Sequence, residues 1–274
     1  MIVTGPDGVE LAVQVHGPED GTPILFVHEF GGDHRSWAPQ VAHFAAHRRC
    51  VTYDARGYPP SAVPTDPAAY SQDHAVADAV AVLDALGIAR ALVVGNSMGG
   101  FATLHLGLRH PERCQGIVVA GCGYGAHPDH TAAFRADALA LADAYERDGS
   151  PAVAADYGNR PARQPLRRRD PEGHAEHLRI LAEHDPTGAA LTMRGVQAAR
   201  PSLYDLRDEL AGLRVPALLV VGDSDRDALD ANLMLAATLP DAGLAVLPRT
   251  GHLTNLELPA VFNGLVEDFA VACG

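Results

Sequence analysis

The sequence has fewer basic than acidic side chains and no long apolar run, and both features exclude classes of protein. Lys and Arg total 21 against 34 Asp and Glu, which gives a net charge of −13 at pH 7. This charge opposes binding to nucleic acid and to anionic membrane surfaces, so we expect neither as a partner. No window approaches the roughly 18 apolar residues of a spanning helix, and the N-terminus has no signal-peptide pattern. The sequence therefore predicts a soluble, cytoplasmic protein.

Cysteine is too sparse and too scattered to organise the structure. The chain has 4 cysteines, and no two of them have C-x-x-C spacing. This pattern indicates neither a disulfide framework nor a zinc site, so we interpret the side chains as reduced and mostly buried thiols. They are Cys50, Cys114, Cys122 and Cys273.

The sequence does contain a repeated alternation of short apolar runs and helical patterns. Its 274 residues, 47% of them hydrophobic and 20% charged, suit one large α/β domain with an insertion. Residues 2–15 predict an antiparallel hairpin, whereas the later runs are continuous, as in buried parallel strands. The alternation predicts a doubly wound, mostly parallel sheet with chemistry at the carboxyl ends of its strands. The continuous runs are residues 23–27, 50–53, 91–94, 116–120, 216–221 and 243–247.

One of these runs ends at a serine between glycines. The stretch Gly95-Asn96-Ser97-Met98-Gly99-Gly100 connects the β-prone residues 91–94 to helical spacing over residues 101–110. A sharp strand-to-helix turn brings backbones so close together that a Cβ would clash at the flanking positions. Such a turn lifts the serine hydroxyl clear of the sheet. The free N–H groups at the start of the helix then favour an anion that develops beside it.

This turn resembles the nucleophile elbow of the α/β-hydrolase family. Four further segments resemble family motifs, and they occur in the family's order, each at a strand end. The resemblance covers nearly all of the core and implies an α/β-hydrolase fold with an inserted helical cap. The four segments are the oxyanion loop 28–32, the D-x-R-G turn 54–57, the G-x-x-D segment 222–225 and the G-H segment 251–252.

The resemblance also implies a role for each matched residue. Ser97 would be the nucleophile, His252 the general base and then acid, and Asp225 the carboxylate that orients the imidazole. The family's acid lies three residues after the strand-end glycine, which selects Asp225 over Asp223. This chemistry requires no metal and no organic cofactor.

The loop after the run 23–27 would supply half of the oxyanion hole. By position, the resemblance assigns the backbone N–H groups of Phe30 and Met98 to the oxyanion. His28 is expected to brace the loop. Glu29 stands where the family usually has glycine, and a carboxylate aimed at the oxyanion would repel it. We expect Glu29 either to point sideways into a hydrogen-bond network or to line the pocket.

The strand pattern vanishes over residues 125–204. Helical patterns occupy residues 130–147, 171–183 and 189–199 of this segment. We therefore expect a core of residues 1–124 and 205–274 and a helical cap of residues 125–204, the segment that in this family covers the active site and sets substrate choice. Besides His28 and Glu29, the strand-end residues Cys122 and Tyr124 are expected to line the pocket.

The expected cap contains a basic cluster. It has two interpretations, which the sequence leaves open: a solvated face, or a surface that recognises a carboxylate of the substrate. The cluster consists of Arg160, Arg163, Arg167, Arg168 and Arg169.

The resemblance implies a serine hydrolase that cleaves an ester or lactone of a small organic substrate through an acyl-enzyme. The serine excludes the dehalogenases and epoxide hydrolases of this fold, which carry aspartate at that position. Two alternatives remain: a carbon–carbon bond hydrolase of ring-cleavage products, and a ligand receptor built on the same fold. The carbon–carbon hydrolases commonly have tryptophan after the histidine, where this chain has Leu253. The partner would be a small molecule, and a homo-oligomer is compatible with the sequence.

Overall fold

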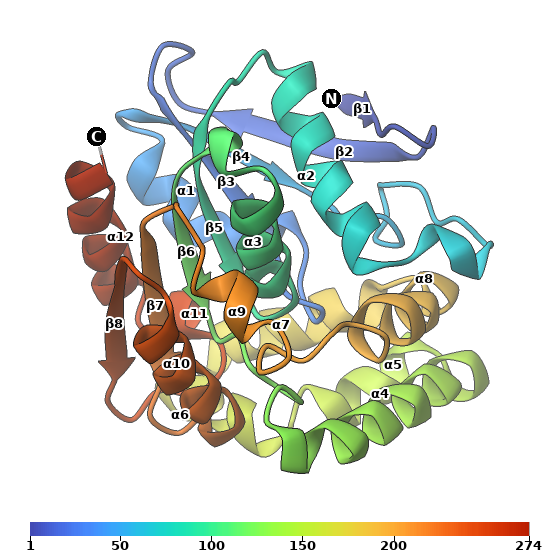
Figure 1. Cartoon of the computed structure of the whole chain (residues 1–274). Helices are drawn as coiled ribbons and strands as arrows, with labels where there is room; N and C mark the ends of the chain where they lie inside the picture. Colours follow the sequence, from blue (N-terminus) through green and yellow to red (C-terminus); the bar gives the residue numbers. More distant parts are fainter. Residues whose placement is uncertain (274) are drawn as a thin grey trace.

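An eight-stranded sheet forms the centre of the structure, a computed structural model that describes residues 1–273 (Figure 1). The first two strands form an antiparallel hairpin, the second also pairs antiparallel with β4, and every other pair is parallel. The predicted doubly wound, mostly parallel sheet is confirmed. The strands are β1 (Ile2–Thr4), β2 (Glu10–His16), β3 (Thr22–Val27), β4 (Arg48–Tyr53), β5 (Ala91–Asn96), β6 (Cys114–Ala120), β7 (Ala217–Gly222) and β8 (Ala242–Leu247).

Helices cover both faces of the sheet, which is why its central strands are continuous apolar runs. Every residue of β5 and of β7 is buried. One face packs against α2, α3 and α10, and the other packs against α1 and α12. The helices are α1 (Ala38–Phe44), α2 (Gln72–Ala85), α3 (Met98–Arg109), α4 (Pro128–Asp148), α5 (Ser150–Tyr157), α6 (Gln164–Arg169), α7 (Pro171–Glu183), α8 (Pro186–Thr192), α9 (Arg207–Leu210), α10 (Arg226–Thr238), α11 (Thr254–Glu257) and α12 (Pro259–Cys273).

The order of the strands places two loops beside each other. Across the sheet the order is β1-β2-β4-β3-β5-β6-β7-β8, so the chain leaves β3 toward one side and returns to its other side in β5. Loops that follow such neighbouring strands diverge and leave a crevice at the carboxyl ends, where ligands of open α/β sheets bind. The loop that begins at His28 follows β3, and Ser97 follows β5.

Helices α4 to α8 lie between β6 and β7 in the chain and gather at the carboxyl ends of the parallel strands, at the bottom of Figure 1. Within this segment, all of which the structure describes, there is no strand. Two of the expected helices correspond to α4 and α7, while the expected helix 189–199 is divided between α8 and a π-helical turn, η5 (Met193–Gln197). An apolar cluster that includes Phe30, Met98 and Tyr145 joins the insertion to the loops of the core.

Among residues 1–273, no helix combines the length and the apolar character needed to cross a membrane.

The contact between the insertion and the core contains buried histidines. The ring of His184, which follows α7, packs edge-on against Tyr58 with 4.9 Å between centroids. His177, within α7, is buried against Gly31 of the loop after β3. Burial lowers the pKa of His184 to about 4 and holds the pKa of His177 well below its ordinary value. Both rings are therefore neutral at pH 7.

We predict that His184 makes the fold sensitive to acid. Because burial lowers its pKa to about 4 in the folded state from the ordinary value of 6.5, the unfolded state binds more protons between these values. Its contribution to stability is complete above pH 6.5 and is lost as the pH falls toward 4, a difference of roughly 3 kcal/mol in the free energy of unfolding. Urea denaturation at a series of pH values should show that His184→Gln loses less stability over this range than the wild type. The exposed His16→Gln is the control, and identical profiles for His184→Gln and wild type would contradict the prediction.

Candidate active site

Ser97 is held in a backbone conformation that side chains rarely adopt. It lies between β5 and α3 with φ of 52° and ψ of −113°. Close packing around it explains this turn: a Cβ added to Gly95 would collide with the carbonyl oxygen of Gly99, and one added to Gly99 would collide with that of Val27. Such strain costs about 1–3 kcal/mol and persists only where the surrounding structure over-determines it.

The side chain of Ser97 is the first member of a hydrogen-bonded series. Its Oγ lies 2.8 Å from Nε2 of His252, and Nδ1 of His252 lies 2.7 Å from Oδ2 of Asp225. A carboxylate only accepts, so Nδ1 carries the proton and Nε2 is free to accept from the serine hydroxyl. His252 and Asp225 are both buried. We call these three residues the Ser-His-Asp array.

The two aspartates that follow β7 have different surroundings. Asp223 is exposed, accepts hydrogen bonds from the Thr250 N–H and the Ser224 hydroxyl, and does not contact His252. Asp225 is fully buried beneath the imidazole. The structure thus places His252 against Asp225, the aspartate that the resemblance selected.

Two backbone N–H groups near Ser97 are free. Among the described residues, neither the Phe30 N–H nor the Met98 N–H donates a hydrogen bond to another backbone group. Met98 is the first residue of α3, where an N–H has no partner within the helix. Phe30 is in the loop after β3, which the packing of Gly99 on Val27 holds against this helix start.

His28 braces that loop. The Ala55 N–H donates to Nε2 of His28 over 3.0 Å, so the ring is the tautomer in which Nδ1 carries the proton and donates to the Glu29 carbonyl, 2.8 Å away. The Tyr58 hydroxyl donates to the Phe30 carbonyl over 3.0 Å. The Asp54 side chain accepts a hydrogen bond from the backbone N–H of His34. The turn that contains Asp54 therefore also holds this loop in place.

The Glu29 side chain points away from Ser97, toward the hydrogen-bonded side chains behind the loop. Its Oε1 accepts from the Ser36 hydroxyl over 3.0 Å, and its carboxylate fills the space that a Cβ on Gly32 would occupy. The side chain is buried, and Oε2 has no hydrogen-bond partner within residues 1–273. Of the two arrangements that the sequence left open, the structure has the sideways one.

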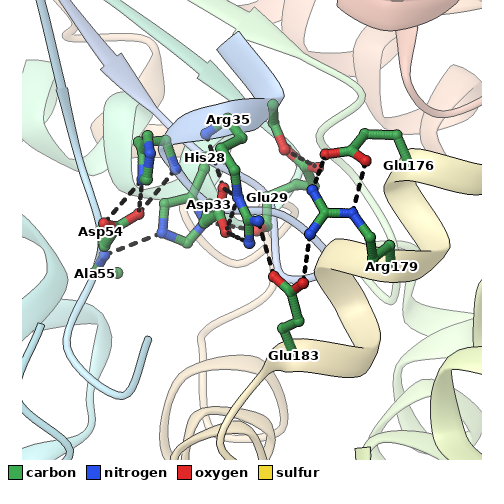
Figure 2. A network of polar contacts seen from close by, with 11 residues as sticks. His28, Glu29, Asp33, Arg35, Asp54, Ala55, Glu176, Arg179 and Glu183 are labelled. Carbon is green, nitrogen blue, oxygen red and sulfur yellow. Dashed lines mark hydrogen bonds and ion pairs between the residues drawn. The ribbon is translucent and has the colours of Figure 1, made fainter. Parts of the chain in front are cut away.

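Charged side chains connect the same loop to α7 (Figure 2). Arg35 donates from Nε to Asp33 and forms an ion pair of 2.8 Å with Glu183 of α7. Glu183 also pairs with Arg179, which binds Glu176. This network fixes the helical insertion to the loop that carries Phe30.

A cavity of about 470 Å³ opens beside Ser97, and we call it the Ser97 cavity. Its wall includes Ser97 and His252 from the core and residues of α4, α5 and η5 from the insertion. The 3₁₀ turn η4 (Pro161–Arg163) also lines this cavity. The backbone N–H of His252 donates to the Ala162 carbonyl of this turn over 3.0 Å. The insertion therefore both covers the array and contacts its histidine.

Only one of the four expected pocket residues lines the Ser97 cavity. Tyr124 does, with its ring edge-on to His252 and 4.9 Å between centroids. Cys122 is buried in the apolar core, where burial raises the pKa of its thiol to about 12. His28 and Glu29 also lie outside the cavity wall, because their side chains face their hydrogen-bond partners, Ala55 and Ser36, behind the loop.

The basic cluster of the sequence is divided. Arg160 and Arg163 line the Ser97 cavity, whereas Arg167, Arg168 and Arg169 are exposed on α6. Arg168 and Arg169 face a separate open cavity of about 1100 Å³ that does not include Ser97.

Arg200 lines the Ser97 cavity beyond η5, a position that the sequence did not predict. Its guanidinium lies 3.6 Å from the centroid of the Phe101 ring and donates to the Tyr124 carbonyl over 2.6 Å. The sequence around Arg200, a single arginine followed by proline, is not a motif that predicts a cavity residue.

The described residues contain one group of side chains with metal-ligand spacing, formed by Asp33, His34 and Asp54. Asp33 is already bound by Arg35, and Asp54 accepts from His34. These interactions satisfy the carboxylates without an ion, so we assign the group a structural role.

The chain is similar to known proteins along most of its length. A family model described as "alpha/beta hydrolase fold" matches residues 22–259. The chain is 28% identical to 3-oxoadipate enol-lactonase 1 of Acinetobacter baylyi, over 97% of this chain and 97% of that protein. It is 30% identical to 2-hydroxymuconate semialdehyde hydrolase of Pseudomonas putida, over 93% of this chain and 89% of that protein.

Solved structures are similar over the whole chain. An enol-lactonase from Burkholderia xenovorans superposes with a TM-score of 0.85 at 28% identity, covering 99% of this chain and 100% of its own. A thermophilic esterase from Thermogutta terrifontis has a TM-score of 0.88 at 23% identity, covering 100% and 98%, which is a likeness of fold.

Proposed function

The chain belongs to the alpha/beta hydrolase fold family and is an enzyme of the hydrolase class, and we propose that it cleaves an ester or lactone of a small organic substrate through an acyl-enzyme on Ser97. The observation that carries this proposal is the Ser-His-Asp array, with 2.8 Å and 2.7 Å between its hydrogen-bonding atoms. These separations are short enough for proton transfer from the hydroxyl to the imidazole.

In the first half of the reaction, Nε2 of His252 accepts the Ser97 proton while Oγ attacks the substrate carbonyl. The imidazolium that forms is stabilised by Asp225. The charge that develops on the carbonyl oxygen is held by the free N–H groups of Phe30 and Met98, which are already fixed in place before the reaction. His252 then donates its proton to the leaving oxygen, and the ester or lactone C–O bond breaks.

In the second half, water replaces the alcohol. His252 removes a proton from the water, hydroxide attacks the acyl carbon, and the same oxyanion site holds the second tetrahedral intermediate. Its collapse returns the proton to Ser97 and releases the acid. For a lactone, the alcohol remains attached to the acyl group, so one product leaves instead of two.

Carbon–carbon bond hydrolysis is the second candidate. It is favoured by the 30% identity to 2-hydroxymuconate semialdehyde hydrolase. The two candidates predict different products, because carbon–carbon cleavage of a ring-cleavage product needs a proton on carbon and ester cleavage needs one on oxygen. A screen of short esters, lactones and ring-cleavage products distinguishes them.

The array predicts the order of three substitutions. Ser97→Ala should abolish labelling by a fluorophosphonate and lower p-nitrophenyl ester turnover by several orders of magnitude, and Asp225→Asn should lower turnover somewhat less. Asp223→Asn is the matched control, because this exposed carboxylate does not contact His252. A larger loss for Asp223→Asn than for Asp225→Asn would overturn the assignment of the acid. A wild-type protein that neither labels nor turns over esters or lactones would contradict the proposed ester or lactone hydrolysis.

We predict that substitution of Glu29 changes the stability of the protein and has little effect on its activity. A carboxylate within about 5 Å of the oxyanion would oppose its charge, but Glu29 points into the support behind the loop. Glu29→Gln should raise the melting temperature, since it removes a buried charge with one hydroxyl partner, and should leave kcat within about tenfold. The checks are calorimetry and a pH–rate profile. Loss of activity in a folded variant, with one limb of the profile missing, would make Glu29 a direct acid or base.

A further inference from the structure

Arg163 is a buried guanidinium that forms no ion pair with any other described residue. Its side chain lines the Ser97 cavity and is 4% exposed, and within residues 1–273 its buried Nε has no hydrogen-bond partner. Arg56, which is equally buried, pairs with Asp78 over 2.7 Å and also with Asp7. Among the residues that the structure describes, one buried arginine is thus neutralised by two carboxylates and the other by none.

The surroundings of Arg163 do not compensate for the loss of water. The guanidinium lies 4.1 Å from the centroid of the Tyr157 ring, an attractive contact but a weak one for a charge removed from solvent. Its neighbour Arg160 is neutralised by Asp137, 2.6 Å away, so it neither requires nor supplies a partner. Asp227 also lines the cavity but is exposed and forms no ion pair among the described residues.

Arg200 adds a second positive charge to the same cavity. Its guanidinium lies between Phe101 and Phe134, with 3.6 Å and 4.8 Å to the ring centroids. It donates to the Gln197 side chain and to the Tyr124 carbonyl, both of which are uncharged. Burial lowers its pKa to about 10, which leaves it charged at neutral pH.

Both arginines are connected to the histidine of the array. Arg163 follows Ala162, whose carbonyl accepts the His252 N–H. Arg200 holds the carbonyl of Tyr124, whose ring contacts His252. A negative group bound in this cavity by these arginines would therefore be held at a fixed position relative to the carbonyl that Ser97 attacks.

We propose that the substrate carries a free carboxylate, separate from the reacting carbonyl, that binds Arg163 through charge-assisted hydrogen bonds while Arg200 supplies a second positive charge. This inference rests on the proposed hydrolysis of an ester or lactone and narrows its substrate to acids. The carboxylate supplies the counter-charge that the protein lacks at this position. The exposed arginines of α6 take no part.

Matched esters test the proposal. One pair is mono-p-nitrophenyl glutarate and its methyl-capped ester, with the carboxylate on the acyl side; the other is 4-butyryloxybenzoate and its methyl ester, with the carboxylate on the alcohol side. In at least one pair, wild-type kcat/KM should favour the anion. Arg163→Gln should lower the anion-to-neutral ratio of kcat/KM roughly 10- to 100-fold, the loss expected for hydrogen bonds to a charged group. Arg167→Gln, an exposed arginine outside the cavity, is the control. Equal losses for both members of each pair, or a wild-type preference for both neutral esters, would overturn the proposal.

A binding measurement separates this proposal from the proposed function. Calorimetric titration of Ser97→Ala with glutarate should show binding, and the double variant Ser97→Ala, Arg163→Gln should show none. If the wild type hydrolyses neither esters nor lactones but glutarate binding depends on Arg163, the hydrolysis proposal is wrong and the carboxylate site stands. If neutral esters are hydrolysed but Arg163→Gln does not weaken glutarate binding, the carboxylate site is wrong. A melting temperature for Arg163→Gln at or above that of the wild type shows that the variant is folded.

Discussion

The close passage of two backbones at Gly99 is the constraint on which the site depends. Only the absence of a side chain lets the first turn of α3 lie against the carbonyl of Val27 at the end of β3. This contact places two segments, which are about 70 residues apart in the chain, beside each other at the switch point of the sheet. The same close packing holds Ser97 at its positive φ, beside the free Met98 N–H at the start of α3.

The insertion is joined to this site by a second close approach. A Cβ on Gly251 would collide with the Ala162 carbonyl, and the same carbonyl accepts the His252 N–H. Glu257 holds the other side of this loop, because its carboxylate accepts from the Gly251 N–H over 2.7 Å. The turn that carries Arg163 and the loop that carries His252 therefore form one unit. A carboxylate bound at Arg163, as we propose, would be aligned with the array through this contact.

Local patterns predicted the sheet and the turn at Ser97, because each depends on spacing within a few residues, whereas the choice of Asp225 came from the resemblance to the α/β-hydrolase family. The direction of a side chain does not have such a signature. Glu29 stands beside the expected oxyanion position in the sequence, yet Ser36 and the absence of a Cβ at Gly32 draw its carboxylate backward. The sequence does not distinguish the arginines of residues 160–169 from one another. In the structure, Arg163 ends a 3₁₀ turn and faces the cavity, whereas Arg167, Arg168 and Arg169 lie on α6 and face solvent. Such outcomes depend on tertiary packing.

The proposed hydrolysis requires a covalent acyl intermediate on Ser97. Rapid quenching of a reaction with p-nitrophenyl acetate, followed by peptide mass spectrometry, tests it directly, because the intermediate adds an acetyl group to one residue. We expect the acetyl group on the peptide that contains Ser97. In His252→Ala, after slow labelling with an activated ester, we expect more of the acetyl-enzyme to accumulate, because the base that activates water for its hydrolysis is absent. Turnover of the ester with no acetylated peptide, or an acetyl group on a different residue, would contradict the claim.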